Sequence, residues 1–101
     1  MIKHIVFFSV CDSFEGMNKI EICRKMKQDL EGLKSLIPQL QAIEVGMNHA
    51  EAPSGNYDIA LYSEFETMAD LDAYQVHPEH KRVAAFIGKV KTARTCVDYE
   101  V

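Results

Sequence analysis

Tyr74-Gln75-Val76-His77-Pro78-Glu79-His80 sets the architecture of the second half of the chain. A proline pushes the residue before it out of the α-helical region, so one helix is predicted to end near His77. Pro78 suits the first turn of a following helix, because the N–H that proline lacks has no helical partner there. The segment therefore predicts a corner between two helices, with Tyr74 and His80 on either side of it.

Helix-like and strand-like patterns alternate outward from this corner. Strands are predicted where β-branched and aromatic residues are frequent, at residues 2–10, 40–47, 57–65 and 92–101. A short helix is predicted to begin at Thr67, with Asp70 three residues later as part of its start signal, and to run to Val76. Pro78 begins the last helix, whose predicted inward stripe is His80, Val83, Ala84, Ile87 and Val90.

A longer helix is predicted between the first two strands. It begins after Cys11, with Asp12 and Glu15 as a capping box or Ser13 as an equally good cap, and it ends at Pro38. Apolar residues recur within it at steps of three and four, which is typical of one buried stripe. The predicted stripe consists of Ile20, Cys23, Met26, Leu30, Leu33 and Ile37.

The predicted order is β-α-β-β-α-α-β in a single domain, residues 1–101. Helices over a four-stranded, mainly antiparallel sheet form the ferredoxin-like α+β sandwich. Such helices cover only one face of the sheet, yet both faces of the first strand are apolar. Alternation places His4, Val6 and Phe8 on one face and Ile5 and Phe7 on the other. We therefore predict a homodimer that packs through the sheet face of Ile5 and Phe7, giving a dimeric α/β barrel.

Composition excludes several classes of partner. The formal net charge is −4 in 101 residues, and no run of Lys and Arg is present, so nucleic acid is not an expected partner. No apolar run approaches the ~20 residues of a membrane span, and no signal peptide is recognisable. The three cysteines, Cys11, Cys23 and Cys96, are widely spaced and are expected to be reduced thiols in a cytoplasmic protein.

Three polar side chains are candidates for a site. Tyr74 and His80 lie on the inward stripes of their helices, and His4 lies beside apolar residues on the first strand. Apolar walls with a few placed polar groups are typical of a small-molecule pocket. An imidazole suits a general base at neutral pH, and a phenol can hold a carbonyl oxygen that gains negative charge. The alternative is structural, since a buried His or Tyr usually has a partner and His77 can cap the helix that Pro78 begins.

Metal and cofactor chemistry have no recognisable motif. His4, His77 and His80 form a conceivable set of metal ligands, but no carboxylate or thiol is spaced with them in a familiar way. No Ser–His–Asp or Cys–His nucleophile pattern and no glycine-rich phosphate loop is present. We therefore predict neither a metal nor a cofactor.

Four segments resemble the stress-responsive A/B barrel (Dabb) family, and together they span the chain. They are Ile2-Lys3-His4-Ile5-Val6-Phe7-Phe8, Tyr57-Asp58-Ile59-Ala60-Leu61 with the following Glu64-Phe65, the Tyr74–His80 segment, and Val97-Asp98-Tyr99. The resemblance implies a dimeric α+β barrel. It implies less about function, because most members have no assigned activity and some are stress-induced or form stable oligomers. One branch contains a plant polyketide cyclase, olivetolic acid cyclase, which performs an intramolecular aldol condensation without a cofactor.

The resemblance places the catalytic tyrosine and histidine of that cyclase on Tyr74 and His80, and one of its pocket histidines on His4. Ile59 stands where the cyclase has another pocket histidine, and Arg94 stands where its pocket is apolar, so the substrate is expected to differ. The predicted catalytic pair is His80 and Tyr74. The predicted ligand-binding residues are His4, Val6, Phe8, Ile59, Leu61, Arg94 and Cys96.

These observations lead to one functional hypothesis and two alternatives. The first is a pocket between helices and sheet that binds a small, partly apolar carbonyl compound, with cofactor-free lyase, cyclase or isomerase chemistry. The second is a non-catalytic stress-response or assembly protein, in which side chains fill the same volume. The third is a cofactor-free monooxygenase that acts on quinols, for which the sequence contains no distinguishing motif.

Overall fold

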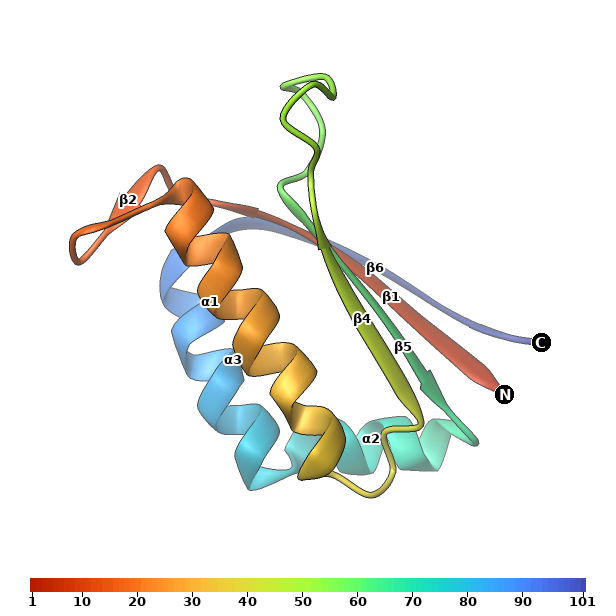
Figure 1. The fold of residues 1–101 in the computed structure, drawn as a ribbon. Helices are drawn as coiled ribbons and strands as arrows, with labels where there is room; N and C mark the ends of the chain where they lie inside the picture. The colour runs from red at the N-terminus through yellow and green to blue at the C-terminus, as the bar shows by residue number, and fades with distance from the viewer.

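All 101 residues are described by the structure, a computed structural model. Four antiparallel strands form one sheet in the order β4-β5-β1-β6, and three α-helices lie on one side of it (Figure 1). The predicted ferredoxin-like α+β fold is confirmed. The sheet strands are β1 (Ile2–Val10), β4 (Ala42–Met47), β5 (Ile59–Phe65) and β6 (Lys91–Glu100). The helices are α1 (Lys19–Gly32), α2 (Met68–Val76) and α3 (Pro78–Val90).

β1 is the central strand of the fold, because it pairs with both β5 and β6. Its alternate residues face the helices and are buried, and they are Ile2, His4, Val6, Phe8 and Val10. Between them Ile5 is half-buried and Phe7 is 42% exposed. The predicted division of the strand into a helix-facing side and an open side is therefore correct, and no helix or strand covers the open side (Figure 1).

The start of α1 differs from the prediction. Residues after β1 form a small hairpin of β2 (Ser13–Phe14) and β3 (Met17–Asn18), and the helix begins only at Lys19. Glu15 and Gly16 both have positive φ, 48° and 84°, which matches the tight turns that join hairpin strands. The N-cap is Asn18, whose side chain accepts from the Glu21 N–H at 2.9 Å in a capping box, so Asp12, Ser13 and Glu15 have no part in the cap.

The buried stripe of α1 is shifted at its first turn. Ile20 is 54% exposed, whereas Ile22 is fully buried, so the prediction was wrong at this position. The remaining members of the predicted stripe, from Cys23 to Ile37, are all buried. The α-helix ends at Gly32 and a 3₁₀ turn (Leu33–Ser35) follows it, so regular helix stops before Pro38. α1 packs against β4 and α3.

The proline corner forms as predicted. Thr67 caps α2, and its side chain accepts from the Asp70 N–H at 3.1 Å. His77 lies between the two helices with extended backbone, ψ 136°, as expected for the residue before a proline. The His77 Nδ1 accepts from the Glu79 N–H at 3.1 Å, so His77 caps α3 and its ring nitrogen has a structural role.

Three of the four strands have boundaries that differ from the prediction by one or two residues. The second predicted strand begins at Ala42 rather than residue 40, because Leu40 is buried in the turn that precedes it. The third begins at Ile59 rather than residue 57, and the side chain of Asp58, just before it, accepts from the Val10 N–H at 2.9 Å. The last strand begins at Lys91, immediately after α3. No helix has the length and apolar character that crossing a membrane requires.

The shifted stripe of α1 gives a matched test of the core. Ile22→Ala removes a fully buried side chain and should lower the free energy of unfolding by about 2–5 kcal/mol. Ile20→Ala removes a half-exposed side chain two residues away and should change it by less than about 0.5 kcal/mol. Urea unfolding followed by circular dichroism measures both. Equal losses for the two variants would contradict this position of the helix.

Candidate functional site

A cavity of 260 Å³ lies between the helices and the sheet, next to the proline corner. Elements from both halves of the chain contribute to its wall, so it forms only when the helices dock on the sheet. The lining residues are His4, Val6 and Phe8 of β1, Leu30 of α1, Leu61 of β5, Gln75 of α2, His80, Ala84 and Ile87 of α3, and Lys91 and Arg94 of β6.

His80 lies in the first turn of α3, where the helix directs it at the cavity. Its Nδ1 atom is buried and has no hydrogen-bond partner. Burial lowers the pKa of the His80 imidazole, and the nearby His4, Arg94 and His77 act in the same direction, while the Gln75 backbone carbonyl opposes them. The imidazole is therefore neutral at pH 7, as a general base requires.

Tyr74 lies directly against His80, with ring centroids 4.5 Å apart. Its side chain is fully buried, packs on Phe65 at 4.9 Å between ring centroids, and does not line the cavity. The Tyr74 hydroxyl also has no hydrogen-bond partner. Burial raises the pKa of this phenol to about 12, so it stays a neutral O–H donor at physiological pH.

Two unpaired buried polar atoms thus sit on two touching rings. They are the Tyr74 hydroxyl and the His80 Nδ1, and the structure contains no other buried side-chain N or O atom without a partner. A buried polar group without a partner costs about 1–3 kcal/mol, so native structures contain few of them. His80 lines the cavity and Tyr74 lies directly behind it, so both unpaired atoms lie next to one cavity, which favours a binding site for a polar ligand.

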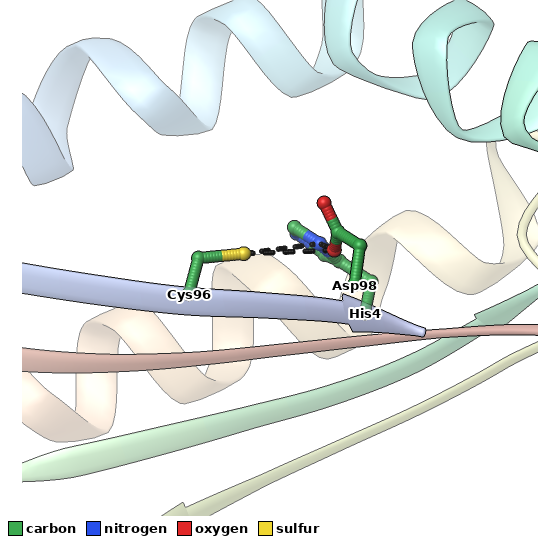
Figure 2. Close-up of side chains that lie close together, drawn as sticks. All are labelled: His4, Cys96 and Asp98. Atoms are coloured by element: carbon green, nitrogen blue, oxygen red, sulfur yellow. Dashed lines mark hydrogen bonds and ion pairs between the residues drawn. The ribbon is translucent and has the colours of Figure 1, made fainter. Parts of the chain in front are cut away.

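His4 enters the cavity wall from the sheet side. Its Nδ1 and the Asp98 Oδ1 are 2.5 Å apart, and the Cys96 Sγ lies 3.6 Å from the same nitrogen (Figure 2). Because Asp98 occupies Nδ1, the ring nitrogen left for a ligand is Nε2. Burial, followed by the charge of Asp98, raises the pKa of the Cys96 thiol, and Arg94 opposes them.

The structure brings together most of the predicted site residues. His4, Val6, Phe8, Leu61, His80 and Arg94 line the cavity. Tyr74 lies behind His80, Cys96 lies beside His4, and Ile59 is buried away from this cavity, at the edge of a different hollow. That hollow, of 640 Å³, lies beside Phe7 and the loop between β4 and β5.

Sequence reasoning missed several residues of this region. Asp98 shares a strand face with Arg94 and Cys96, but only the register of β1 with β6, which pairs His4 with Asp98, brings it to the imidazole. Lys91 was missed because it sits at the junction of α3 and β6. Gln75 and Leu30 were missed because nothing in their spacing marks them as cavity residues.

Comparison with known proteins identifies the family. The family model Dabb, described as Stress responsive A/B Barrel Domain, matches residues 2–101. The chain belongs to this family. A search of the curated proteins found no match.

Solved structures agree with this assignment to the A/B barrel family. A protein from Bacteroides fragilis, described as dimeric, of unknown function and with a ferredoxin-like fold, is 37% identical with a TM-score of 0.87, over 99% of this chain and 95% of the other. A dimeric ferredoxin-like protein of unknown function from Thermobifida fusca is 27% identical with a TM-score of 0.83, over 99% and 90%. A hydroxynitrile lyase from Passiflora edulis, 16% identical with a TM-score of 0.81 over 99% and 92%, shares the fold alone.

The lowered pKa of His80 predicts a pH dependence of stability. The unfolded chain, with a histidine pKa near ~6.5, binds the proton more readily than the folded one, so the free energy of unfolding should fall as the pH drops below ~6.5 and level off below the folded pKa. Replacing His80 with Gln should reduce that fall.

Urea unfolding at about pH 7.5 and about pH 5.5 measures the difference for each variant. His49→Gln is the matched control, because His49 lies in the exposed loop after β4, and it should keep the wild-type pH dependence. If His80→Gln and the wild-type protein lost the same stability on acidification, His80 would not be the source of this pH dependence.

Proposed function

We propose that the cavity beside His80 binds a small, partly apolar carbonyl compound that carries a negative charge. The main observation in support of this proposal is that the Tyr74 hydroxyl and the His80 Nδ1 are buried without a hydrogen-bond partner. The cavity volume of 260 Å³ lies just below the usual range of about 300–1,000 Å³ for ligand pockets, which favours a small ligand. The apolar part of the wall, with Val6, Leu61 and Ile87 among its members, would contact a short hydrocarbon segment.

The charge of the wall supports an anionic ligand. Lys91 and Arg94 line the cavity, neither forms an ion pair within the chain, and no Asp or Glu is among the lining residues. This is a local excess of positive charge in a chain whose net charge is −4. A guanidinium binds carboxylate or enolate oxygens with paired N–H donors, so Arg94 is the expected partner of the charged group.

The proposed reaction is proton abstraction from a carbon beside the carbonyl. A neutral His80 accepts the proton at a ring nitrogen, and the electron pair of the C–H bond moves to the carbonyl oxygen, giving an enolate. Arg94 lines the cavity and offers a positive charge to that oxygen. The Tyr74 hydroxyl, kept neutral by burial, lies against His80 outside the cavity lining, so it donates to the oxygen only when the bound ligand moves the His80 ring. Cofactor-free aldol condensations and keto–enol isomerisations begin with such a step.

The alternative of a purely structural protein is less well supported. It expects side chains to fill the volume around His4, Tyr74 and His80, and that volume instead contains a cavity next to two unpaired polar atoms. No observation favours the monooxygenase alternative.

We further propose that the chain works as a homodimer through its open sheet face. Three similar structures are described as dimeric proteins. Phe7, Val97 and Tyr99 on this face are 42%, 60% and 43% exposed. At its edge the Lys3 ammonium donates to Tyr62 and Glu64, each at 2.7 Å, so the charges there are already paired. A second sheet packed on this face would bury these apolar side chains.

Proton exchange tests the proposed chemistry. 4-Oxopentanoate in D₂O with a chelator is a suitable probe, because it carries a ketone and a carboxylate and its C–H signals are followed by NMR. The protein should accelerate deuterium incorporation beside the ketone. His80→Ala should reduce the accelerated rate by about 10²-fold or more, through loss of the base. Tyr74→Phe should reduce it by about 10²-fold, through loss of the oxyanion donor.

His49→Ala, at an exposed loop histidine, is the control and should exchange at the wild-type rate. Circular dichroism and light scattering establish that each variant keeps its fold and its oligomeric state. An undiminished rate in His80→Ala would end the catalytic assignment. Absence of both exchange and binding in the wild-type protein would end the proposed function.

The proposed dimer predicts the molecular mass of the protein in solution. Light scattering at micromolar concentration should give about twice the chain mass of 11.5 kDa. Phe7→Asp places a charge in the proposed interface and should shift the mass toward that of one chain. Met68→Asp, at a residue with similar exposure on the helical side, should leave it unchanged. A wild-type mass of 11.5 kDa would refute the dimer.

A further inference from the structure

The side chains of His4, Cys96 and Asp98 gather on the helix-facing side of the sheet, between β1 and β6 (Figure 2). β1 and β6 pair His4 with Asp98 directly, and Cys96 lies two residues earlier on β6, where alternation gives it the same face. The set therefore rests on strands rather than on a loop. An imidazole nitrogen, a thiol sulfur and a carboxylate oxygen, all within 4.8 Å of one another, have no shared role in the function proposed above.

Two of the three distances between the possible ligand atoms fit a tetrahedral metal centre. Zn²⁺ is bound at about 2.0–2.1 Å by nitrogen or oxygen and about 2.3 Å by sulfur, so ligand atoms of one tetrahedron lie roughly 3.3–3.6 Å apart. The Cys96 Sγ is 3.6 Å from the His4 Nδ1 and 3.5 Å from the Asp98 Oδ1. The third edge, from Nδ1 to Oδ1, is 2.5 Å and is held by a hydrogen bond. An ion between these two atoms would replace that hydrogen bond and increase the distance from Nδ1 to Oδ1 by less than about 1 Å.

Burial and access also suit an ion. His4 is 3% exposed, and its ring packs edge-on against Phe65, so the first ligand is held firmly. The Asp98 side chain is 31% exposed and belongs to the edge strand β6, so it has room to rotate and leaves a path from solvent. Thiolate and imidazole ligands favour zinc-type ions over Mg²⁺ and Ca²⁺, which prefer oxygen.

We propose that His4, Cys96 and Asp98 form a binding site for one zinc-type divalent ion. On binding, the imidazole proton moves from Nδ1 to Nε2 and the thiol proton passes to solvent. The ion then carries two positive charges against one thiolate and one carboxylate, so the centre is neutral. Three protein ligands leave the fourth position for water or for an oxygen of a small molecule, as in zinc sites that keep an open position. The proposal does not depend on the function of His80.

Cobalt binding tests this site directly. The protein is freed of metal with a chelator, dialysed against Co²⁺ and Zn²⁺ in turn, and analysed for bound metal. We expect one ion per chain and, with Co²⁺, a thiolate-to-metal charge-transfer band. Cys96→Ser should lose the band and bind Zn²⁺ more than about tenfold more weakly, and Asp98→Asn should keep the band but also bind more than about tenfold more weakly.

Cys11→Ser is the matched control, because Cys11 is also half-buried but is not part of this cluster, and it should behave as wild type. Circular dichroism establishes that the variants fold, which the partial exposure of Cys96 and Asp98 favours. The site is refuted when the wild-type protein takes up no stoichiometric metal. It is also refuted when Cys96→Ser binds Zn²⁺ and shows the cobalt band as the wild-type protein does.

Discussion

The restriction that Pro78 places on His77 underlies the arrangement of the site. A residue before proline avoids the helical region, so the chain turns at His77 and starts α3 in a new direction. That turn brings Tyr74 and His80 into contact, although they belong to different helices. The His77 ring is used as a cap and is not free for chemistry. A continuous helix over the same residues would place Tyr74 and His80 six positions apart on one helix, on different faces.

The second constraint is that one layer of helices covers only one face of a sheet. Beneath that layer, β1 supplies His4 to the cavity wall, and α3 supplies His80 from above. The uncovered face retains Phe7, Val97 and Tyr99 in contact with solvent. The same alternation along β1 therefore accounts for a buried site on one side and a surface suited to a second copy on the other. Membership of the A/B barrel family and the dimeric descriptions of similar structures agree with this account.

Most of the fold is predictable from the sequence because its signals are local. Pro78, the Thr67 cap and the alternation of β1 each act within a few residues. The start of α1 was not predictable in this way, because Asp12 with Glu15 and Asn18 with Glu21 offer the same capping pattern, and only the hairpin turn at Glu15 and Gly16 selects the second. Ile20 and Ile22 are equally apolar, so periodicity does not decide which one is buried.

The site is less predictable than the fold, because it depends on the register between strands and on how deeply each side chain is buried. His80 and His4 could be identified from the sequence, because each lies on the apolar face of its helix or strand. The contact of His4 with Asp98 depends on how β6 pairs with β1. Alternation predicts which face of β6 points to the helices, but a shift of two residues would keep that face and give His4 a different partner. The depth of Tyr74 depends on how closely α2 packs on Phe65, which is a property of the assembled core.

The central claim is that the cavity beside His80 binds a small anionic carbonyl compound. NMR spectra of the histidine rings, recorded while 4-oxopentanoate is added in the presence of a chelator, test it most directly. The account predicts that the His80 and His4 ring signals shift in a saturable manner and that Arg94→Ala weakens the effect. Unchanged His80 and His4 signals at high ligand concentration, or shifts confined to the exposed His49, would contradict it.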